Sequence, residues 1–278
     1  MPTPFADSPE FQRLLRGDER ADLTRIALEI AADAYPGLEA GSVLGAIDGL
    51  AGRVRQRVPA AAGTRQVVGQ INWVLFVEEG FQGNVEDYYD PRNSYLNEVL
   101  GRKTGIPISL SVLYLALAER VGLPMAGVNL PAHFVVRAGQ GTETVFVDPF
   151  HAGALLDRAG CQRRVAEVSG RTEPLTEAEL APCPTGVIVT RMLRNLKATY
   201  LQRQDFAAAV PVQRRLVALL EDDPLERRDL GVVCLHAGRP GEALDHLPAY
   251  LAAFPQAEDT EAVGALLRVA RREVAQRN

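Results

Sequence analysis

One stretch of the chain, residues 105–150, limits its possible folds more than any other. It begins with GIPISLSVLYLALAERVGLP, in which apolar residues recur at helical spacing until Gly122 and Pro124 interrupt them. Three short segments rich in β-forming residues follow: MAGVNL, HFVVRA and TVFVDPF. A helix that leads into a short antiparallel sheet is typical of the α+β class, and we expect that class here.

The residues before this stretch predict a helical N-terminal segment. Apolar positions between about Phe11 and Glu79 fit four helices, with Asp22 and Ser42 as N-cap residues. On the fourth of these helices, Trp73 and Phe76 share one face, so both are expected in the core. Packing alone accounts for this region.

The chain is long enough for two domains. Its 278 residues exceed the roughly 100–200 of a typical single domain. We expect a first domain over residues 1–160 and a linker over 161–185, where prolines, glycines and glutamates dilute the apolar pattern. The remaining residues, 186–278, read as helices only.

An internal repeat is present in the last part of the chain. RQDFAAA and GRPGEAL are offset by about 34–35 residues, the length of a tetratricopeptide repeat. Gly231, Ala243 and Pro255 stand where that repeat places its small residues and its terminating proline. Such a stack of helices leaves a concave face that commonly binds peptides, but it would serve equally to cover the first domain.

Composition and cysteine spacing exclude several classes of protein. The net charge is −5, so a basic surface for nucleic acid is not expected. No run approaches the roughly 18 apolar residues of a membrane span, and the first residues lack the apolar core of a signal peptide. Cys161, Cys183 and Cys234 are widely spaced, which argues against disulfides and zinc and fits a reducing cytoplasm. We expect a cytoplasmic protein with no cofactor and no metal.

The succession of GIPISLSVLYLALAERVGLP, HFVV and VFVDP resembles the transglutaminase-like core. In that family a nucleophilic cysteine opens the helix, a histidine starts one strand and an aspartate ends the next. These last two residues match His133 and Asp148. In such a triad the histidine takes the proton of the nucleophile and the aspartate fixes the imidazole tautomer. The place of the cysteine, however, falls on Pro107, which offers no nucleophile.

Two hydroxyl groups lie close to that position, those of Ser109 and Ser111. Either would complete a hydrolytic triad with His133 and Asp148, because a triad is defined by its geometry. A serine in the first turn of a helix is more often a cap or a donor to the backbone, and His133 would fit equally well as a buried partner of Asp148. No chemistry is assigned to the other three histidines, which have no ligand partners at useful spacing: His151, His236 and His246.

A closer resemblance covers nearly the whole chain. EDYYDPRNSYLNEVLGRKTGIPISLSVLYLALAERVGLP, then GVNLPAHFVVR and VFVDPFHAG, then the helical repeats, are similar to the SirB-type family. The resemblance implies a transglutaminase-like (papain-like) core with a short antiparallel sheet, followed by an all-α tetratricopeptide-like domain. That family keeps the proline of GIP, whereas its commoner PGHF is replaced here by PAHF.

The polar segment YYDPRNSYLNEVL has a more specific composition than a simple spacer would need. Arg92 offers a planar fork suited to a carboxylate, so in the cleft it would bind a peptide carboxyl-terminus or an anionic small molecule. Paired with Asp87 or Glu98 it would instead order the loop, which we favour because a long loop needs internal bonds. The segment provides the following candidate binding residues: Tyr89, Asp90, Arg92, Asn93 and Asn97.

The sequence predicts a non-catalytic transglutaminase-like protein that binds a protein or peptide partner through its cleft and its helical repeats. The alternative is a serine-dependent hydrolase or acyltransferase that uses Ser109 or Ser111 with His133 and Asp148. A structural module without a cleft ligand is the third hypothesis.

Overall fold

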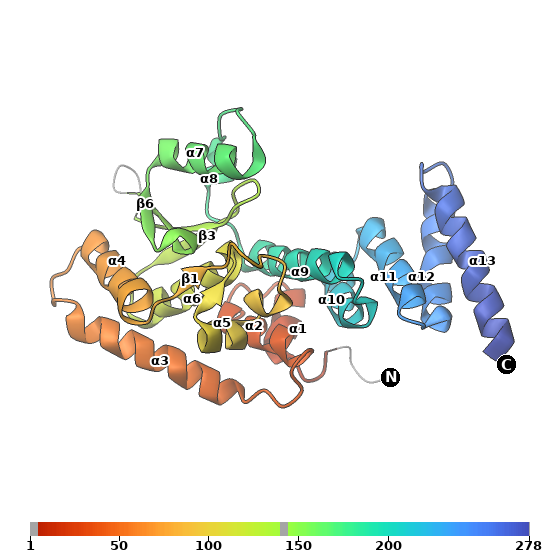
Figure 1. Ribbon diagram of the computed structural model, residues 1–278, viewed down its shortest axis with the longest axis horizontal. Coiled ribbons are helices and arrows are strands. Elements are labelled where there is room, and N and C mark those ends of the chain that lie inside the picture. Colours follow the sequence, from red (N-terminus) through yellow and green to blue (C-terminus); the bar gives the residue numbers. More distant parts are fainter. Residues whose placement is uncertain (1–4, 140–143, 278) are drawn as a thin grey trace. The chain divides into compact units, whose positions relative to one another are not determined.

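A computed structural model describes residues 5–139 and 144–277 of the chain (Figure 1). The chain divides into two compact units, Met1–Met192 and Leu193–Asn278. The division falls inside one helix, α9 (Thr185–Gln202). Across the described ranges, no helix is both long enough and apolar enough to cross a membrane.

The first unit opens with the four predicted helices: α1 (Pro9–Leu15), α2 (Leu23–Ala32), α3 (Ala40–Arg57) and α4 (Thr64–Asn72). Asp22 caps α2 as expected, because its side chain accepts a hydrogen bond from the Arg25 amide at 3.1 Å. Ser42 is not a cap, since it lies inside α3 and follows two helical residues.

The prediction that Trp73 belongs to the core is wrong, because its side chain is 46% exposed. At Trp73 the α-helix gives way to a π-helical turn, η1 (Trp73–Glu78). The wider turn changes the direction of successive side chains, so helical spacing does not hold through it. The exposed indole instead lies beneath the Arg57 guanidinium, 5.2 Å from the ring centroid.

The centre of the first unit is helix α6 (Pro107–Arg120), which packs on a four-stranded sheet. Every residue of α6 from Pro107 to Ala118 is buried except Leu115, as is typical of a helix covered on several sides. The sheet is antiparallel, in the order β3 (Met125–Val128), β4 (Val135–Ala138), β5 (Val145–Asp148) and β6 (Ala154–Leu156). The predicted α+β class is confirmed.

The polar segment before α6 is an ordered part of the fold. Its elements are β1 (Gln82–Gly83), the 3-10 turn η2 (Pro91–Asn93), α5 (Leu96–Arg102) and β2 (Thr104–Gly105). Strands β1 and β2 pair in parallel and so close the segment at both ends. Only glycine fits at position 83, because a Cβ there would lie 2.6 Å from the ring of Phe150. The segment is therefore held against the turn that follows β5.

The structure does not form a linker at 161–185. Helix α7 (Arg158–Ser169) begins before this range, and α8 (Glu177–Leu180) lies within it. The prolines and glycines mark the ends of short helices rather than an open chain; Gly170, for example, ends α7 with φ +71°. Residues of the range share one hydrophobic cluster with residues of the sheet: Val128, Leu130, Val135, Phe146, Cys161, Val165, Leu175 and Leu180.

The second unit holds the end of α9 and four further helices: α10 (Phe206–Leu219), α11 (Pro224–His236), α12 (Pro240–Ala253) and α13 (Thr260–Arg277). From α10 onward, each helix packs beside the next (Figure 1). Helices α10 and α12 begin at Phe206 and Pro240, 34 residues apart, which agrees with the repeat length read from the sequence. Pro255 follows the end of α12, as the repeat requires.

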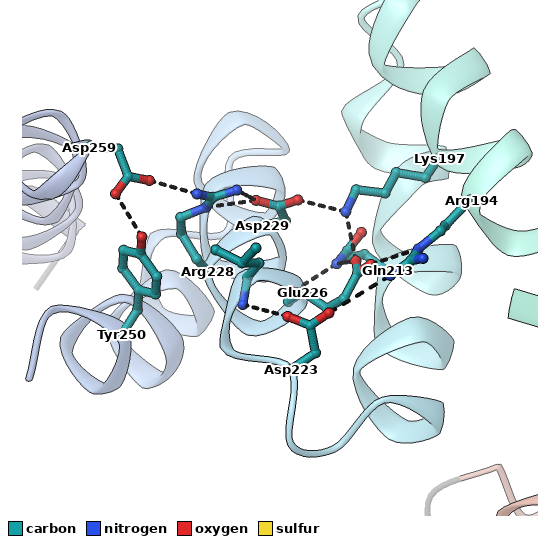
Figure 2. Close-up of polar contacts among 10 residues, drawn as sticks. Arg194, Lys197, Gln213, Asp223, Glu226, Arg228, Asp229, Tyr250 and Asp259 are labelled. Carbon is teal, nitrogen blue, oxygen red and sulfur yellow. Dashed lines mark hydrogen bonds and ion pairs between the residues drawn. The ribbon is translucent and has the colours of Figure 1, made fainter. Parts of the chain in front are cut away.

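A buried carboxylate connects three helices of the second unit, as Figure 2 shows. Glu226 of α11 is only 5% exposed. Its Oε1 accepts from Arg194 at 3.1 Å, and its Oε2 accepts from Lys197 at 2.7 Å and from Gln213 at 2.8 Å. Burial acts to raise the pKa of Glu226, but the hydrogen bonds from Lys197 and Gln213 outweigh burial and hold that pKa below its usual range.

A chain of charged groups continues from this carboxylate toward the last helix (Figure 2). Lys197 also contacts Asp229 at 2.6 Å, and Arg228 contacts both Asp229 at 2.7 Å and Asp259 at 2.6 Å. The Tyr250 hydroxyl donates to Asp259 at 2.6 Å. These contacts join α9, α11 and α12 to the residue just before α13, so polar pairing as well as apolar packing orders the stack.

Gly231 should be essential to the packing of α11 on α12. A Cβ at this position would lie 2.6 Å from Cδ2 and 2.7 Å from Cγ of Leu247. For Gly231→Ala we expect a net loss of about 1–2 kcal/mol, because overpacking costs roughly 1–3 kcal/mol and exceeds the gain in helix propensity. The matched control is Gly264→Ala in α13, where a Cβ meets only the end of Arg268 at 3.6 Å. This control should be neutral or stabilising. Urea unfolding followed by circular dichroism measures both, and equal effects would contradict the close crossing.

Candidate functional site

The first unit brings together two residues named by the sequence, His133 and Asp148. Asp148 is the last residue of β5, and His133 lies two residues before β4. Pairing of these strands sets Val136 opposite Val147, so the ends that carry the two side chains are adjacent. His133 Nε2 lies 3.0 Å from Asp148 Oδ2, and the two residues are 2% and 0% exposed.

A second histidine and an arginine contact the same carboxylate oxygen. His151 ends the 3-10 turn η4 (Pro149–His151), and its Nδ1 lies 2.8 Å from Asp148 Oδ2. Arg164 of α7 places its Nε 3.0 Å from that oxygen, in an orientation too bent for a hydrogen bond. By contrast, Asp148 Oδ1 is buried and has no hydrogen-bond partner among the described residues. One oxygen therefore carries all three of these contacts.

Asp148 remains a carboxylate over the whole neutral range. Burial acts to raise the pKa of Asp148, but the hydrogen bonds from His133 and His151 outweigh burial and hold the pKa well below its usual range. The site is thus a buried negative charge faced by two imidazoles and a guanidinium. Such a cluster can orient a histidine as a base, or it can provide ligand atoms to a cation.

Sequence reasoning missed His151 and Arg164 as members of this site. A signal for His151 exists in DPFH, since a 3-10 turn begun by Pro149 returns the third residue to the side chain of Asp148. For Arg164 the sequence holds no signal, because α7 is brought to the sheet by packing of its apolar residues. Their positions come from tertiary structure.

Neither serine of α6 is hydrogen-bonded to His133. Pro107 occupies the first position of the helix and is buried. The Ser109 hydroxyl donates to the Asn93 carbonyl at 2.5 Å and accepts from the Ile106 amide at 3.0 Å, so both of its roles are taken. Ser111 is 0% exposed, and its hydroxyl has no hydrogen-bond partner among the described residues. The structure thus assembles the His–Asp pair without joining a hydroxyl to it.

The cysteines are not activated thiols. Burial, with the nearby charge of Asp148, raises the pKa of Cys161 to about 12. Cys183 also has a raised pKa, chiefly because of burial, and its thiol donates to the Gly127 carbonyl at 3.3 Å. Burial and the charge of Glu242 raise the pKa of Cys234 to about 11. All three are free cysteines, and a thiol must ionise to act as a nucleophile.

The polar segment orders itself through Asp90 and Asn93. The Asp90 side chain caps η2 and pairs with Arg92 at 2.8 Å and with Arg102 at 3.1 Å. Asn93 is 0% exposed, and its amide donates to the Asp87 carbonyl at 2.7 Å. Arg92 is therefore a clamp, although its partner is Asp90 rather than either of the two acids expected.

The other two candidate binding residues lie outside this clamp. Tyr89 is 48% exposed, and its ring meets Tyr88 edge-on at 5.3 Å. Asn97 is half-buried, and its Oδ1 has no hydrogen-bond partner among the described residues. Tyr89 is the one aromatic residue among the five candidates, and it is exposed to solvent.

Backbone strain lies next to His133. Ala132 has φ +57°, in the left-handed region, where a residue with a Cβ is disfavoured by about 1–2 kcal/mol. A glycine at this position, as in PGHF, would carry no such strain. The tight turn nevertheless forms, and the His133 amide donates to the Leu130 carbonyl at 3.2 Å.

Fold and site together define a transglutaminase-like protein that carries tetratricopeptide-like helices. A model of the transglutaminase-like superfamily matches residues 41–194, and a tetratricopeptide repeat model matches residues 196–268. A UPF0162 protein of Xylella fastidiosa is 34% identical over 249 residues, which are 88% of this chain and 89% of that protein. The chain belongs to this UPF0162, or SirB-type, family.

Two further relatives match shorter parts of the chain. A UPF0162 protein of Vibrio cholerae is 30% identical over 161 residues, covering 57% of this chain and 59% of the relative. F-box only protein 21 of Homo sapiens is 39% identical over 110 residues, or 37% of this chain and 18% of that protein. No solved structure matches the chain.

Asp148 should be essential to the stability of the first unit. For Asp148→Asn we expect a loss of about 3–5 kcal/mol at pH 7, because two imidazoles and Arg164 lose their buried counter-charge. The folded pKa is below the unfolded value of about 3.9, so this stabilisation is present above that value and is lost as pH falls through the folded pKa. Stability of the wild type should therefore drop steeply below about pH 4, and that of the variant less so.

The measurement is urea unfolding at neutral and acid pH, with Asp87→Asn as the matched control. Asp87 is exposed, so its replacement should change the free energy of unfolding by less than about 0.5 kcal/mol. Equal losses in the two variants would contradict the assignment of Asp148 as the central charge.

Proposed function

We propose that this protein is a non-catalytic transglutaminase-like protein that binds a protein or peptide partner. One observation supports this most directly: among the described residues, no serine or cysteine makes a hydrogen bond to His133. Pro107 stands where the nucleophile would be, and the Ser109 hydroxyl holds the preceding loop. Covalent acyl transfer needs a protein nucleophile beside the general base, so this arrangement favours binding over a transglutaminase-type reaction.

The helical repeats support a protein partner. Stacks of this kind present extended surfaces that commonly bind peptides, and the buried network around Glu226 would keep such a surface rigid. The net charge of −5 makes nucleic acid a poor partner. Because all three cysteines are free thiols, the proposed compartment is the reducing cytoplasm.

An aromatic surface beside the His–Asp pair supports a second contact in the first unit. Tyr88 and Tyr89 are 36% and 48% exposed, and the Tyr88 ring lies 6.3 Å from that of Phe150. The Phe150 ring in turn lies 6.3 Å from the His133 ring. Tyrosine is enriched among the hot-spot residues of interfaces. In this proposal Asp90, Arg92 and Asn93 order the loop, and Tyr89 makes the contact.

The enzymatic alternative depends on Ser111. Its hydroxyl is available, since it lacks a hydrogen-bond partner among the described residues, yet the side chain is fully buried. Catalysis would require both His133 and a substrate to reach it. Ser109 is the weaker candidate, because attack would require its bonds to Asn93 and Ile106 to break.

Catalysis can be tested with a fluorophosphonate probe and an activated ester. We expect no probe on Ser109 or Ser111 and the same slow ester turnover in wild type, Ser111→Ala and His133→Ala. His133→Ala should instead lose about 2–4 kcal/mol of stability, since it leaves Asp148 with one buried hydrogen bond fewer. Labelling of Ser111, together with turnover that vanishes in His133→Ala, would establish the hydrolase.

Partner binding can be tested with peptides selected from a random display library on the full chain. Tyr89→Ala should weaken binding of peptides that contact the first unit by about 10-fold or more, because a central aromatic side chain of an interface typically contributes over 1 kcal/mol. Gln82→Ala is a suitable control, since Gln82 is also exposed and belongs to the same segment. Fluorescence polarisation gives both dissociation constants, and equal values in the two variants would remove Tyr89 from the proposed surface.

A further inference from the structure

The Asp148 cluster has the composition of a metal site. Ligand atoms of His133, Asp148 and His151 all lie within 4.8 Å of one another. They combine two imidazole nitrogens with one carboxylate oxygen, a donor set that suits zinc and other first-row divalent cations better than magnesium or calcium. The sequence did not predict it, because His151 reaches the site only through the η4 turn.

Two of the three spacings among these atoms are close to those of ligands around a cation. Asp148 Oδ2 lies 3.0 Å from His133 Nε2 and 2.8 Å from His151 Nδ1. Zn²⁺ holds nitrogen and oxygen ligands at about 2.0–2.2 Å, which sets tetrahedral neighbours roughly 3.3 Å apart. The ion would fit once the two imidazole nitrogens, which lie within 4.8 Å of each other, also approach this spacing. A neutral imidazole can offer its lone pair at either nitrogen, so both histidines can change from donor to ligand by moving a proton within the ring.

The unpaired oxygen of Asp148 is a second, independent observation. Asp148 is 0% exposed, yet its Oδ1 has no hydrogen-bond partner among the described residues. An unsatisfied buried acceptor lowers the stability of the fold, and a bound ion nearby is one physical reason for it. With a cation on one oxygen, the bent contact of Arg164 could move to the other, so that both oxygens would be satisfied.

We propose that His133, Asp148 and His151 bind one divalent first-row cation of the zinc type, with Arg164 as a neighbour that orients the carboxylate. Access comes through His151, whose side chain is 36% exposed, whereas the other two ligands are buried. Three protein ligands leave a fourth position for water. The proposal concerns binding of the ion and is independent of whether the protein is catalytic.

The first test is a titration of the full, untagged chain with Zn²⁺ by calorimetry and with Co²⁺ by visible absorption. The wild type should bind one ion, and bound Co²⁺ should show the intense bands of a low-coordinate site. His151→Ala should weaken binding by more than about 100-fold, since losing a ligand exceeds the 10–100-fold typical of losing an outer neighbour. His151 is half-buried at a turn, so this variant should fold.

The matched control is His236→Ala, which removes an exposed histidine of the second unit and should leave Zn²⁺ affinity unchanged. Arg164→Gln should weaken Zn²⁺ binding by about 10–100-fold, because it removes the side chain that orients the Asp148 carboxylate. The proposal is overturned if the wild type binds no Zn²⁺, if His151→Ala and His236→Ala bind equally well, or if Arg164→Gln binds as tightly as the wild type.

Discussion

A negative charge sealed inside the first unit is the constraint on which the candidate site depends. The Asp148 carboxylate is fully buried, and an isolated ion in such a position would be prohibitively costly. Its cost is offset by groups from three different places: the turn before β4, the turn after β5, and helix α7. Residues distant in the sequence must therefore come together before the charge is tolerated, which ties the sheet to the helix that follows it.

A second interaction gives the start of α6, where a nucleophile would stand in a transglutaminase-like enzyme, a structural role. Ser109 joins the start of α6 to the loop, because its hydroxyl binds the backbone of both Asn93 and Ile106. Proline at the first helical position costs nothing, since its missing amide would have had no partner there. The first turn of α6 thus anchors the polar segment. A group that fixes the backbone in this way cannot also attack a substrate without loosening the loop.

The sequence predicted the features that depend on local periodicity or on residues close together in the chain. Helical spacing predicted α6, runs of β-forming residues predicted the strands, and the repeat offset predicted the helices of the second unit. The resemblance to the transglutaminase-like core named His133 and Asp148 together, and the adjacent antiparallel strands β4 and β5 bring them into contact. The features that the sequence did not predict depend on tertiary packing. They are the π-turn at Trp73, the burial of α7 in the expected linker, and the contact of Arg164 with the Asp148 carboxylate. The spacing of residues along the sequence does not predict such contacts.

Asp148 in the first unit and Glu226 in the second are both buried carboxylates held ionised by neighbouring donors, and the two differ in one respect. Both oxygens of Glu226 accept hydrogen bonds, from Arg194 on one side and from Lys197 and Gln213 on the other. Its hydrogen-bonding capacity is therefore used by the fold, as expected of a structural charge. Asp148 concentrates its contacts on one oxygen and leaves the other without a partner among the described residues. Since an unused buried acceptor lowers stability, the fold retains at Asp148 a cost that it avoids at Glu226. Strain next to His133 at Ala132 adds a second cost at the same place. Two such costs at one point are typical of sites kept for binding, and they distinguish the Asp148 cluster from the structural charge of Glu226.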